Sequence, residues 1–161
     1  MIGLPAGLGL LKPPSASEYN YFKINITANN GYTLMTQITT IRLYDKSGNL
    51  IHPVMTTETT PAPFVVSASG SYAGGSSSGI SKPFDANTTT WWGTAGGVTG
   101  WIMLYIGTIA KSFGSIYIES AIAANRAAKD FTVQLSTNGS SFETALSVVG
   151  NTSAAATFTA P

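Results

Sequence analysis

Apolar and polar residues alternate in several short stretches of this chain, and each stretch predicts a half-buried β-strand. In residues 21–27, every second residue from Phe22 to Ile26 is apolar, and the residues between them are polar. Further strands are predicted at residues 41–44, 64–69, 116–119 and 131–136, with two short ones near residues 142–149 and 158. Turn signals such as Asn138-Gly139 separate the strands, and the pattern contains no long amphipathic helix. It therefore predicts an all-β fold, an antiparallel β-sandwich or jelly roll.

The predicted fold is organised around residues 84–107. This stretch ends in Trp-Ile-Met-Leu-Tyr-Ile-Gly at residues 101–107, which is apolar at every position before the glycine. A short run that is apolar on both faces predicts a central strand buried between two layers. The turn before it contains Asp85 and Asn87, whose side chains bond neighbouring backbone N–H groups in such loops. A rigid polar loop beside a buried strand is typical of a binding scaffold rather than of a catalytic centre.

Three other segments are predicted to be irregular. Residues 51–63 are rich in Thr and Pro and are expected to be exposed. Residues 70–81 consist mainly of Gly and Ser, so we expect a loop that is too small-sided to pack and is mobile or laid over a surface. Residues 121–129 are rich in Ala and are expected to form a loop with at most one turn of helix.

The first 17 residues form a leader that differs from the sandwich domain predicted for residues 18–161. Residues 1–14 are apolar and rich in Gly and Pro, and no positive charge precedes Lys12, which argues against a signal peptide. The leader is too short to span a bilayer, so we expect no membrane span. It can lie on its own domain or be buried in a neighbouring protein, and we favour the neighbour because an exposed apolar patch is unfavourable. The predicted anchoring residues are Ile2, Leu4, Leu8, Leu10 and Leu11.

Charged residues make up only 9% of the chain, against about 25% in an average domain. Ser, Thr, Asn and Gly replace them, which suits strands and tight turns and also a surface covered by neighbouring subunits. We therefore expect a homo-oligomer. The net charge of +1 offers no electrostatic footprint for nucleic acid. Because the chain has no cysteine, disulfides, thiolate zinc sites and cysteine nucleophiles are excluded.

The sequence contains no recognisable catalytic constellation, so we predict a non-enzyme. The single histidine, His52, has no acidic neighbour in sequence and is expected to be a surface or packing residue. The seven acidic residues are scattered, and no pair has a glycosidase context. No Gly-rich phosphate-binding loop precedes a helix.

Three motifs in this chain together resemble the discoidin-like (coagulation-factor C-type) galactose-binding modules. They are Pro-Phe-Asp-Ala-Asn at residues 83–87 with Thr90-Trp91, the run at residues 101–107, and Lys-Asp-Phe-Thr-Val-Gln-Leu-Ser-Thr-Asn-Gly-Ser-Ser-Phe at residues 129–142. The resemblance implies a jelly roll of the galactose-binding type. Residues 21–27 and 41–43 resemble the strand pair that closes such modules at the C-terminus, and here they come first, which implies a permuted arrangement. Permuted standalone versions with a short apolar leader resemble virion proteins of tailed phages.

The resemblance also implies a structural calcium ion. Family members often hold it with the loop Asp, a nearby Thr, main-chain carbonyls and a Glu from the closing strands. The matching oxygen donors here are Asp85, Asn87 and Thr90. The Glu position is Thr40, which leaves one carboxylate; the usual Asp of the central strand is Tyr105, and the usual Gly after the loop Asp is Ala86. Two interpretations remain open, a calcium site and a loop held by its own hydrogen bonds.

Carbohydrate binding requires an exposed aromatic ring that stacks on the sugar and planar polar groups that bond its hydroxyls. Trp91 and Trp101 match family positions that pack inward, so we expect both in the core. Neighbours in an extended segment point to opposite faces, so we expect Trp92 to point outward. Because the family carries its ligand on loops at one end of the fold, the other candidates are Tyr72, Asn125 and Arg126. A subunit contact explains the same residues equally well, since Trp, Tyr and Arg are also common interface anchors.

These features predict a non-enzymatic structural protein on the surface of a phage virion, as a capsid or tail decoration or beside a fibre. Its leader would dock into other virion proteins, and its domain would face host-surface glycans. Weak binding by many copies would give adhesion through avidity. The alternative is a free-standing carbohydrate-binding (lectin-like) adhesion module, in which the leader is incidental.

Overall fold

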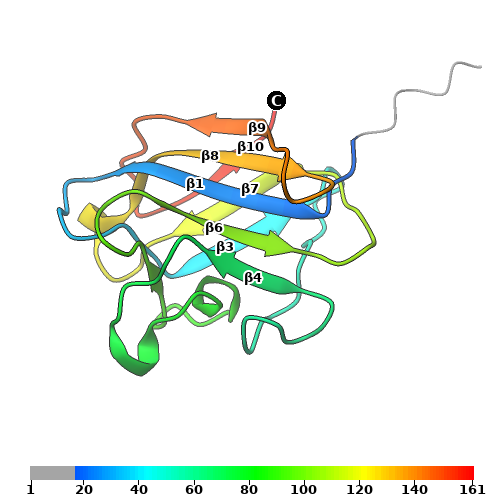
Figure 1. Ribbon diagram of the computed structural model, residues 1–161. Coiled ribbons are helices and arrows are strands. Elements are labelled where there is room, and N and C mark those ends of the chain that lie inside the picture. Colours follow the sequence, from blue (N-terminus) through cyan, green and yellow to red (C-terminus); the bar gives the residue numbers. More distant parts are fainter. Residues whose placement is uncertain (1–16) are drawn as a thin grey trace, which may run out of the picture.

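The computed structural model describes residues 17–161, and this part of the chain is all-β with antiparallel sheets, as predicted. It contains ten strands, three single-turn 3-10 helices and no α-helix. The strands are β1 (Tyr21–Asn29), β2 (Gln37–Ile38), β3 (Thr40–Tyr44), β4 (Val65–Ala68), β5 (Trp92–Gly93), β6 (Gly100–Tyr105), β7 (Ser115–Glu119), β8 (Ala128–Ser136), β9 (Glu143–Val148) and β10 (Ala155–Thr159). They form a five-stranded sheet in the order β4-β6-β1-β8-β9, a three-stranded sheet in the order β10-β7-β3, and the pair β2-β5 (Figure 1).

The opening strand β1 lies in the middle of the five-stranded sheet. It pairs with β6 on one side and with β8 on the other, so that Ile24 faces both Ile102 and Val133. Phe22, Ile24 and Ile26 are at most 1% exposed, because the alternation read from the sequence turns all three to one face. The prediction that residues 21–27 and 101–107 belong to one folded body is confirmed.

One hydrophobic core lies between the two larger sheets. Figure 1 shows the three-stranded sheet behind the five-stranded one, and the buried side chains of both sheets form one cluster. Ile41 and Ile118 from the three-stranded sheet join Ile24 and Leu104 from the five-stranded sheet. Burial of this apolar surface is the main stabilising contribution, at about 25 cal/mol per Å² removed from water.

The central strand β6 is buried on one face only, so the prediction of a doubly buried run is wrong. Ile102 and Leu104 are 0% exposed and point into the core. Trp101, Met103 and Tyr105 are half-buried on the opposite face. The other large sheet covers only one face of β6, so the apolar residues of the second face form an outer surface. The prediction that Trp101 packs inward is therefore also wrong.

Of the three segments predicted to be irregular, residues 51–63 are more buried than predicted. Residues 51–63 contain none of the strands, but Ile51 and His52 are each 6% exposed and Met55 is 0% exposed, so the predicted exposure is wrong there. The Gly/Ser-rich segment contains the 3-10 helix η1 (Gly75–Ser77), and residues 71–77 are exposed, with the backbone at Gly74 laid over the Trp91 ring. A Cβ atom on Gly74 would lie 2.3 Å from Cζ2 of Trp91. The Ala-rich segment contains the single turn η3 (Ala124–Arg126), as predicted, but its last two residues already belong to β8.

The strand register divides the molecule into two ends. Tyr21, Tyr105 and Ser136 lie at one end of the five-stranded sheet, while the strands β6 and β8 begin at the other end. We call the first the terminal end, because the described chain begins and ends there: the Tyr19 N–H donates to the Lys111 carbonyl, and the Ala160 N–H donates to the Gly114 carbonyl.

We call the opposite end the loop end, because it carries residues 30–36, 69–99 and 120–127, which connect the strands there. In Figure 1 the terminal end lies toward the right and the loop end toward the left. No helix in residues 17–161 has the length and hydropathy needed to cross a membrane.

Candidate functional site

Trp91 and Trp92 point to opposite faces, as predicted, but Trp92 faces the core and Trp91 faces the surface. Trp92 is 0% exposed, and its Nε1–H donates to the Gly70 carbonyl at 2.8 Å, so the polar atom of the buried ring is satisfied. Trp91 is half-buried at the surface. The prediction that Trp92 is the outward ring is therefore wrong, because β5 pairs with β2 in the phase that turns Trp92 toward the core. Trp91 takes its place as the aromatic candidate.

Trp91 and Tyr72 form an aromatic pair at the loop end. Their ring centroids lie 6.2 Å apart with an angle of 36° between the planes, within the usual range for interacting aromatic rings. Tyr72 is held in place because its N–H donates to the Gly93 carbonyl at 2.8 Å. Its side chain is 37% exposed. The pair thus offers two partly exposed aromatic rings on a fixed backbone.

Arg126 and Tyr32 form a second cluster at the same end. The guanidinium carbon of Arg126 lies 4.3 Å from the Tyr32 ring centroid, and its Nη1–H donates to Oε1 of the buried Gln37 at 3.3 Å. The buried Nε–H of Arg126 has no hydrogen-bond partner among the described residues. Asn125 is exposed, and its carbonyl accepts the N–H of Tyr32 at 3.2 Å. Arg126 is therefore oriented by its neighbours, and its unpaired Nε–H is buried away from solvent.

The pairing of β2 with β5 joins the two clusters. Gln37 contacts Arg126 and lies opposite Gly93, whose backbone contacts Tyr72. A Cβ atom on Gly93 would lie 2.9 Å from the Trp91 ring and 3.3 Å from Cβ of Tyr72, so a glycine is required for these residues to meet. The structure thus places Tyr72, Asn125 and Arg126 at one end of the molecule, as predicted.

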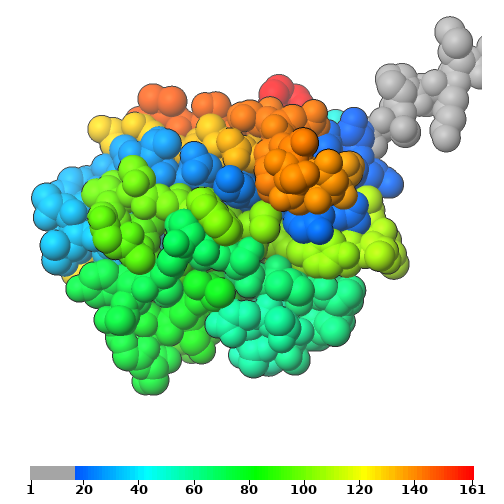
Figure 2. Space-filling view, in the orientation of Figure 1, coloured from blue at the N-terminus to red at the C-terminus, as the bar shows by residue number. Residues whose placement is uncertain are grey.

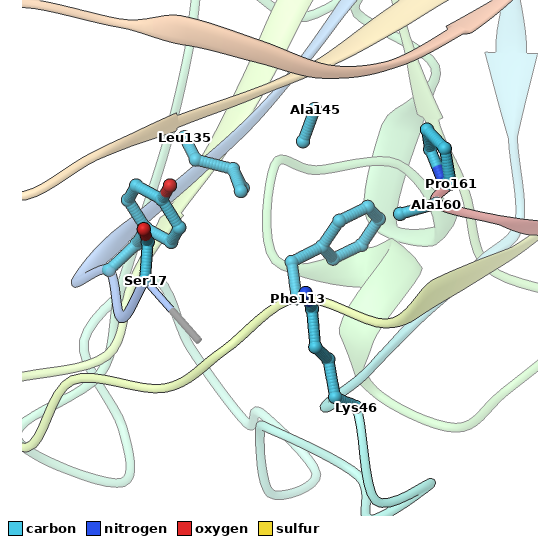
Figure 3. Close-up of a pocket in the computed structure, with 8 residues that line it drawn as sticks. Ser17, Lys46, Phe113, Leu135, Ala145, Ala160 and Pro161 are labelled. Carbon is cyan, nitrogen blue, oxygen red and sulfur yellow. The ribbon is translucent and has the colours of Figure 1, made fainter. Parts of the chain in front are cut away.

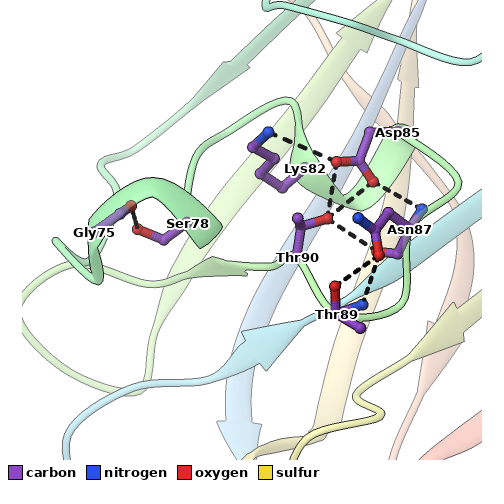
Figure 4. Close-up of polar contacts among 7 residues, drawn as sticks. All are labelled: Gly75, Ser78, Lys82, Asp85, Asn87, Thr89 and Thr90. Atoms are coloured by element: carbon purple, nitrogen blue, oxygen red, sulfur yellow. Dashed lines mark hydrogen bonds and ion pairs between the residues drawn. The ribbon is translucent and has the colours of Figure 1, made fainter.

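The predicted calcium donors also come together, but they bond to one another (Figure 4). The Thr90 hydroxyl contacts both carboxylate oxygens of Asp85, at 3.0 and 2.8 Å, and also the Asn87 carbonyl at 2.9 Å. The Asn87 N–H donates to Oδ1 of Asp85 at 2.9 Å. Nζ of Lys82 lies 3.8 Å from Oδ2 of Asp85 and partly neutralises the carboxylate.

This arrangement fits a loop held by its own hydrogen bonds better than a calcium site. Ca²⁺ takes six to eight oxygen ligands, whereas the cluster supplies one carboxylate whose oxygens already accept hydrogen bonds. No group of three or more His, Cys, Asp or Glu residues within residues 17–161 is placed to hold a metal ion. The hydroxyl of Thr40, at the position that the resemblance gives to a Glu, is buried and has no hydrogen-bond partner within residues 17–161. Calcium binding stays a prediction that this geometry disfavours.

Ala86 lies at a position whose backbone conformation favours glycine. Its φ is 60°, in the left-handed region that L-residues other than Gly, Asn and Asp adopt at a cost. The Asp85 side chain accepts the N–H two residues on and stabilises the turn that forces this conformation. The family's usual glycine at this point thus has a backbone explanation that does not involve a ligand.

His52 is a packing residue rather than a catalytic base. Its Nδ1–H donates to the Pro53 carbonyl at 2.9 Å, which leaves Nε2 to accept the Leu43 N–H at 3.4 Å. The ring edge packs on Phe84 with the centroids 5.1 Å apart. Burial lowers the pKa of His52 below its usual value, so the ring is neutral in the folded protein. With both nitrogens bonded, the imidazole has no free lone pair for proton transfer.

The attachment point of the leader lies at the terminal end. Ser17 and Tyr19 line a hollow of about 170 Å³ together with Ala160 and Pro161 from the end of the chain (Figure 3). The predicted anchoring residues Ile2, Leu4, Leu8, Leu10 and Leu11 lie outside the described residues. The leader is therefore attached at the end opposite to Tyr72 and Arg126.

Comparison of the chain with protein-family models, with curated proteins and with solved structures gives no match in any of the three. Sequence reasoning missed two residues of the loop end, Trp91 and Tyr32. For Tyr32 no signal was present, because the contact with Arg126 joins positions far apart in the chain. The sequence shows that Trp91 and Trp92 point to opposite faces, but which of them faces the core depends on the pairing of β5 with β2.

Proposed function

We propose that this chain is a non-enzymatic structural protein on the surface of a tailed-phage virion. Its leader docks into other virion proteins through Ile2, Leu4, Leu8, Leu10 and Leu11, and the domain of residues 18–161 faces outward. The domain is a discoidin-like jelly roll in permuted form. Its loop end binds host-surface glycans weakly, and many copies provide adhesion through avidity.

The observation that carries this proposal is the separation of the two ends. The leader is attached at the terminal end, beside Tyr19 and Ala160, whereas the aromatic and guanidinium groups cluster at the loop end. An anchored adhesion protein needs this polarity, because a ligand-binding surface next to the anchor would be covered by the particle. A surface covered by neighbouring subunits needs less charge for solubility, which fits the 9% of charged residues.

The strand order supports the permuted jelly roll. The opening strands complete both sheets, since β1 lies in the centre of the five-stranded sheet and β3 at the edge of the three-stranded sheet. Closing strands of a permuted module would occupy such positions. The last strand, β10, packs onto the same core, with Phe158 edge-on to Phe131 at a centroid distance of 5.3 Å. The domain is thus completed by its first strands.

Leucine substitutions in the leader test the docking. In the native phage, a variant with Leu8, Leu10 and Leu11 all changed to Ser is expected to fold normally but to be missing from purified particles, because the apolar contacts with the neighbour are lost. Quantitative mass spectrometry of the particles measures its copy number against wild type. A matched variant with Ser15 and Ser17 changed to Ala should incorporate normally. Full incorporation of the leucine variant would rule out docking through the leader.

The alternative, a free-standing lectin-like module, is favoured by the partly exposed Tyr72–Trp91 pair. A subunit contact in a homo-oligomer uses the same residues. Glycan binding and sedimentation, both measured on the Trp91→Ala and Arg126→Ala variants, distinguish a sugar-binding site from a subunit contact. Lost glycan binding in an unchanged oligomer favours the lectin, and a smaller oligomer favours the subunit contact.

A further inference from the structure

The outer face of the five-stranded sheet carries a hollow that the loop-end site does not use. It has a volume of about 200 Å³, and we call it the outer-face hollow. Its lining residues come from β1, β6 and the turn between β8 and β9, and are Lys23, Trp101, Met103, Gly139 and Phe142. The volume lies below the range of about 300–1,000 Å³ that is usual for drug-sized ligands, so it suits a single ring.

The floor of the outer-face hollow is fixed by the strand register. Lys23 faces Met103 directly across the β1–β6 ladder, and Trp101 lies one outward position further along β6. Tyr21 and Tyr105 extend the same face, with their rings 4.7 Å apart. Backbone pairing on both sides of β1 holds this floor rigid, so little conformational entropy is lost when a ligand binds.

The wall of the outer-face hollow is also preorganised. Oδ1 of Asn138 accepts the N–H groups of Ser140 and Ser141, each at 2.9 Å, which fixes the turn that ends at Phe142. Gly139 has φ +74°, and a Cβ atom there would lie 2.9 Å from the Tyr21 ring, so only glycine lets the turn approach the sheet so closely. In Figure 2 this orange segment stands against the blue and lime strands on the face toward the viewer.

Lys23 places an uncompensated positive charge between two aromatic rings. Its Nζ lies 5.4 Å from the Trp101 ring centroid and 5.1 Å from the Phe142 ring centroid. Within residues 17–161 the ion pair of Lys82 with Asp85 is the only one, so the Lys23 ammonium has no carboxylate within 4.0 Å. Its donors are thus available to an anion, and the rings hold the ammonium in position.

We propose that the outer-face hollow binds an acidic sugar residue of a glycan. The sugar carboxylate pairs with Lys23, and the apolar face of the sugar ring packs on Trp101 and Phe142. The ammonium supplies the charge complementarity, and the aromatic rings supply a surface for C–H groups. That the ligand is a sugar rests on the proposed attachment to glycans. The hollow adds a preference for a sugar that carries a negative charge.

Glycan binding by the full chain tests this site. An array that displays neutral glycans together with glycans containing glucuronic or sialic acid identifies the best probe, whose affinity is then measured by calorimetry. Lys23→Gln and Trp101→Ala are each expected to weaken binding of the acidic probe about tenfold or more, the size of one charge-assisted contact. Lys23→Arg, which keeps the charge, should retain most of the affinity. Lys46→Gln, an exposed lysine outside the outer-face hollow, is the matched control, and near-UV circular dichroism checks that each variant is folded.

The outcomes separate this site from the proposed function. If acidic glycans bind but only Trp91→Ala or Arg126→Ala weakens them, attachment to glycans stands and the outer-face hollow is not the site. If Trp101→Ala weakens the binding of neutral and acidic glycans equally, and Lys23→Gln binds both as the wild type does, the hollow does not select an acidic sugar. If no glycan binds, even on a multivalent array, the proposed attachment fails together with this inference. A change of oligomeric state in Trp101→Ala, with glycan binding intact, would make the face a subunit contact instead.

Discussion

At the residue scale, His52 stabilises the fold only as a neutral ring. Both nitrogens bond to backbone groups, and one of these bonds requires an unprotonated Nε2. Protonation would break the bond to the Leu43 N–H and leave a charge in the core beside Phe84. Burial lowers the pKa of His52 in the folded protein, whereas the unfolded chain has the usual value of 6.5.

The free energy of unfolding is therefore expected to fall as the pH drops below about 6.5, because the unfolded chain then binds a proton that the folded protein excludes. Above that pH both states are neutral and this contribution is constant. Since the chain has one histidine and Asp and Glu ordinarily titrate near pH 4, urea unfolding between pH 7.5 and 5 isolates the effect. His52→Gln should be less stable at pH 7.5 but nearly independent of pH in this window. An equal pH slope in the two proteins would contradict the assignment to His52.

At the element scale, the β2–β5 pair decides which of two adjacent tryptophans is structural. Ile38 pairs with Trp92, and the indole fills the core under the loop end. Trp91 lies on the other face, against Tyr72 and Gly74. Two side chains of identical chemistry thus have opposite roles because the side-chain period of an extended segment is two.

The two alanine substitutions are expected to differ strongly in stability. Trp92→Ala should lower the free energy of unfolding by about 3–5 kcal/mol, because it leaves a large cavity and an unbonded Gly70 carbonyl. Trp91→Ala should cost about 1 kcal/mol, since its ring is already half in water. Equilibrium denaturation in urea measures both, each variant serving as the control for the other. A larger loss in Trp91→Ala than in Trp92→Ala would contradict the structure.

The strands could be predicted from the sequence because alternation at period two depends only on which face is buried. Residues 21–27 and 131–136 are clear cases, and both appear as strands of the five-stranded sheet. The run at 101–107 could not be resolved in this way, because an apolar residue at every position fits either two buried faces or one buried face and an apolar outer surface. The outer-face hollow was therefore invisible in the sequence.

The candidate site was predictable only in part. The loops that carry Tyr72 and Arg126 follow from the strand order, but the phase of Trp91 depends on the pairing of β5, which no local pattern encodes. The hydrogen bonds of the Asp85 loop were one of two predicted alternatives, because the residue types that hold such a turn also supply oxygens for a cation.

At the scale of the whole molecule, the two ends of the domain differ. Its first and last described strands bring both ends of residues 17–161 to the terminal end, and the long connections bring aromatic and guanidinium groups to the loop end. The proposed anchoring through the leader uses the first end and leaves the second free. The outer-face hollow opens on the outer face of the five-stranded sheet, and the turn that forms its wall follows Ser136 at the terminal end.

Electron cryomicroscopy of the native phage particle tests the proposed anchoring most directly. The account predicts copies of this domain on the particle surface, with the terminal end beside Tyr19 and Ala160 turned toward the particle, and with Trp91 and Arg126 turned toward solvent. Density for residues 1–14 should be buried in a neighbouring protein. Copies with the loop end against the particle, or particles that lack the protein altogether, would contradict the account.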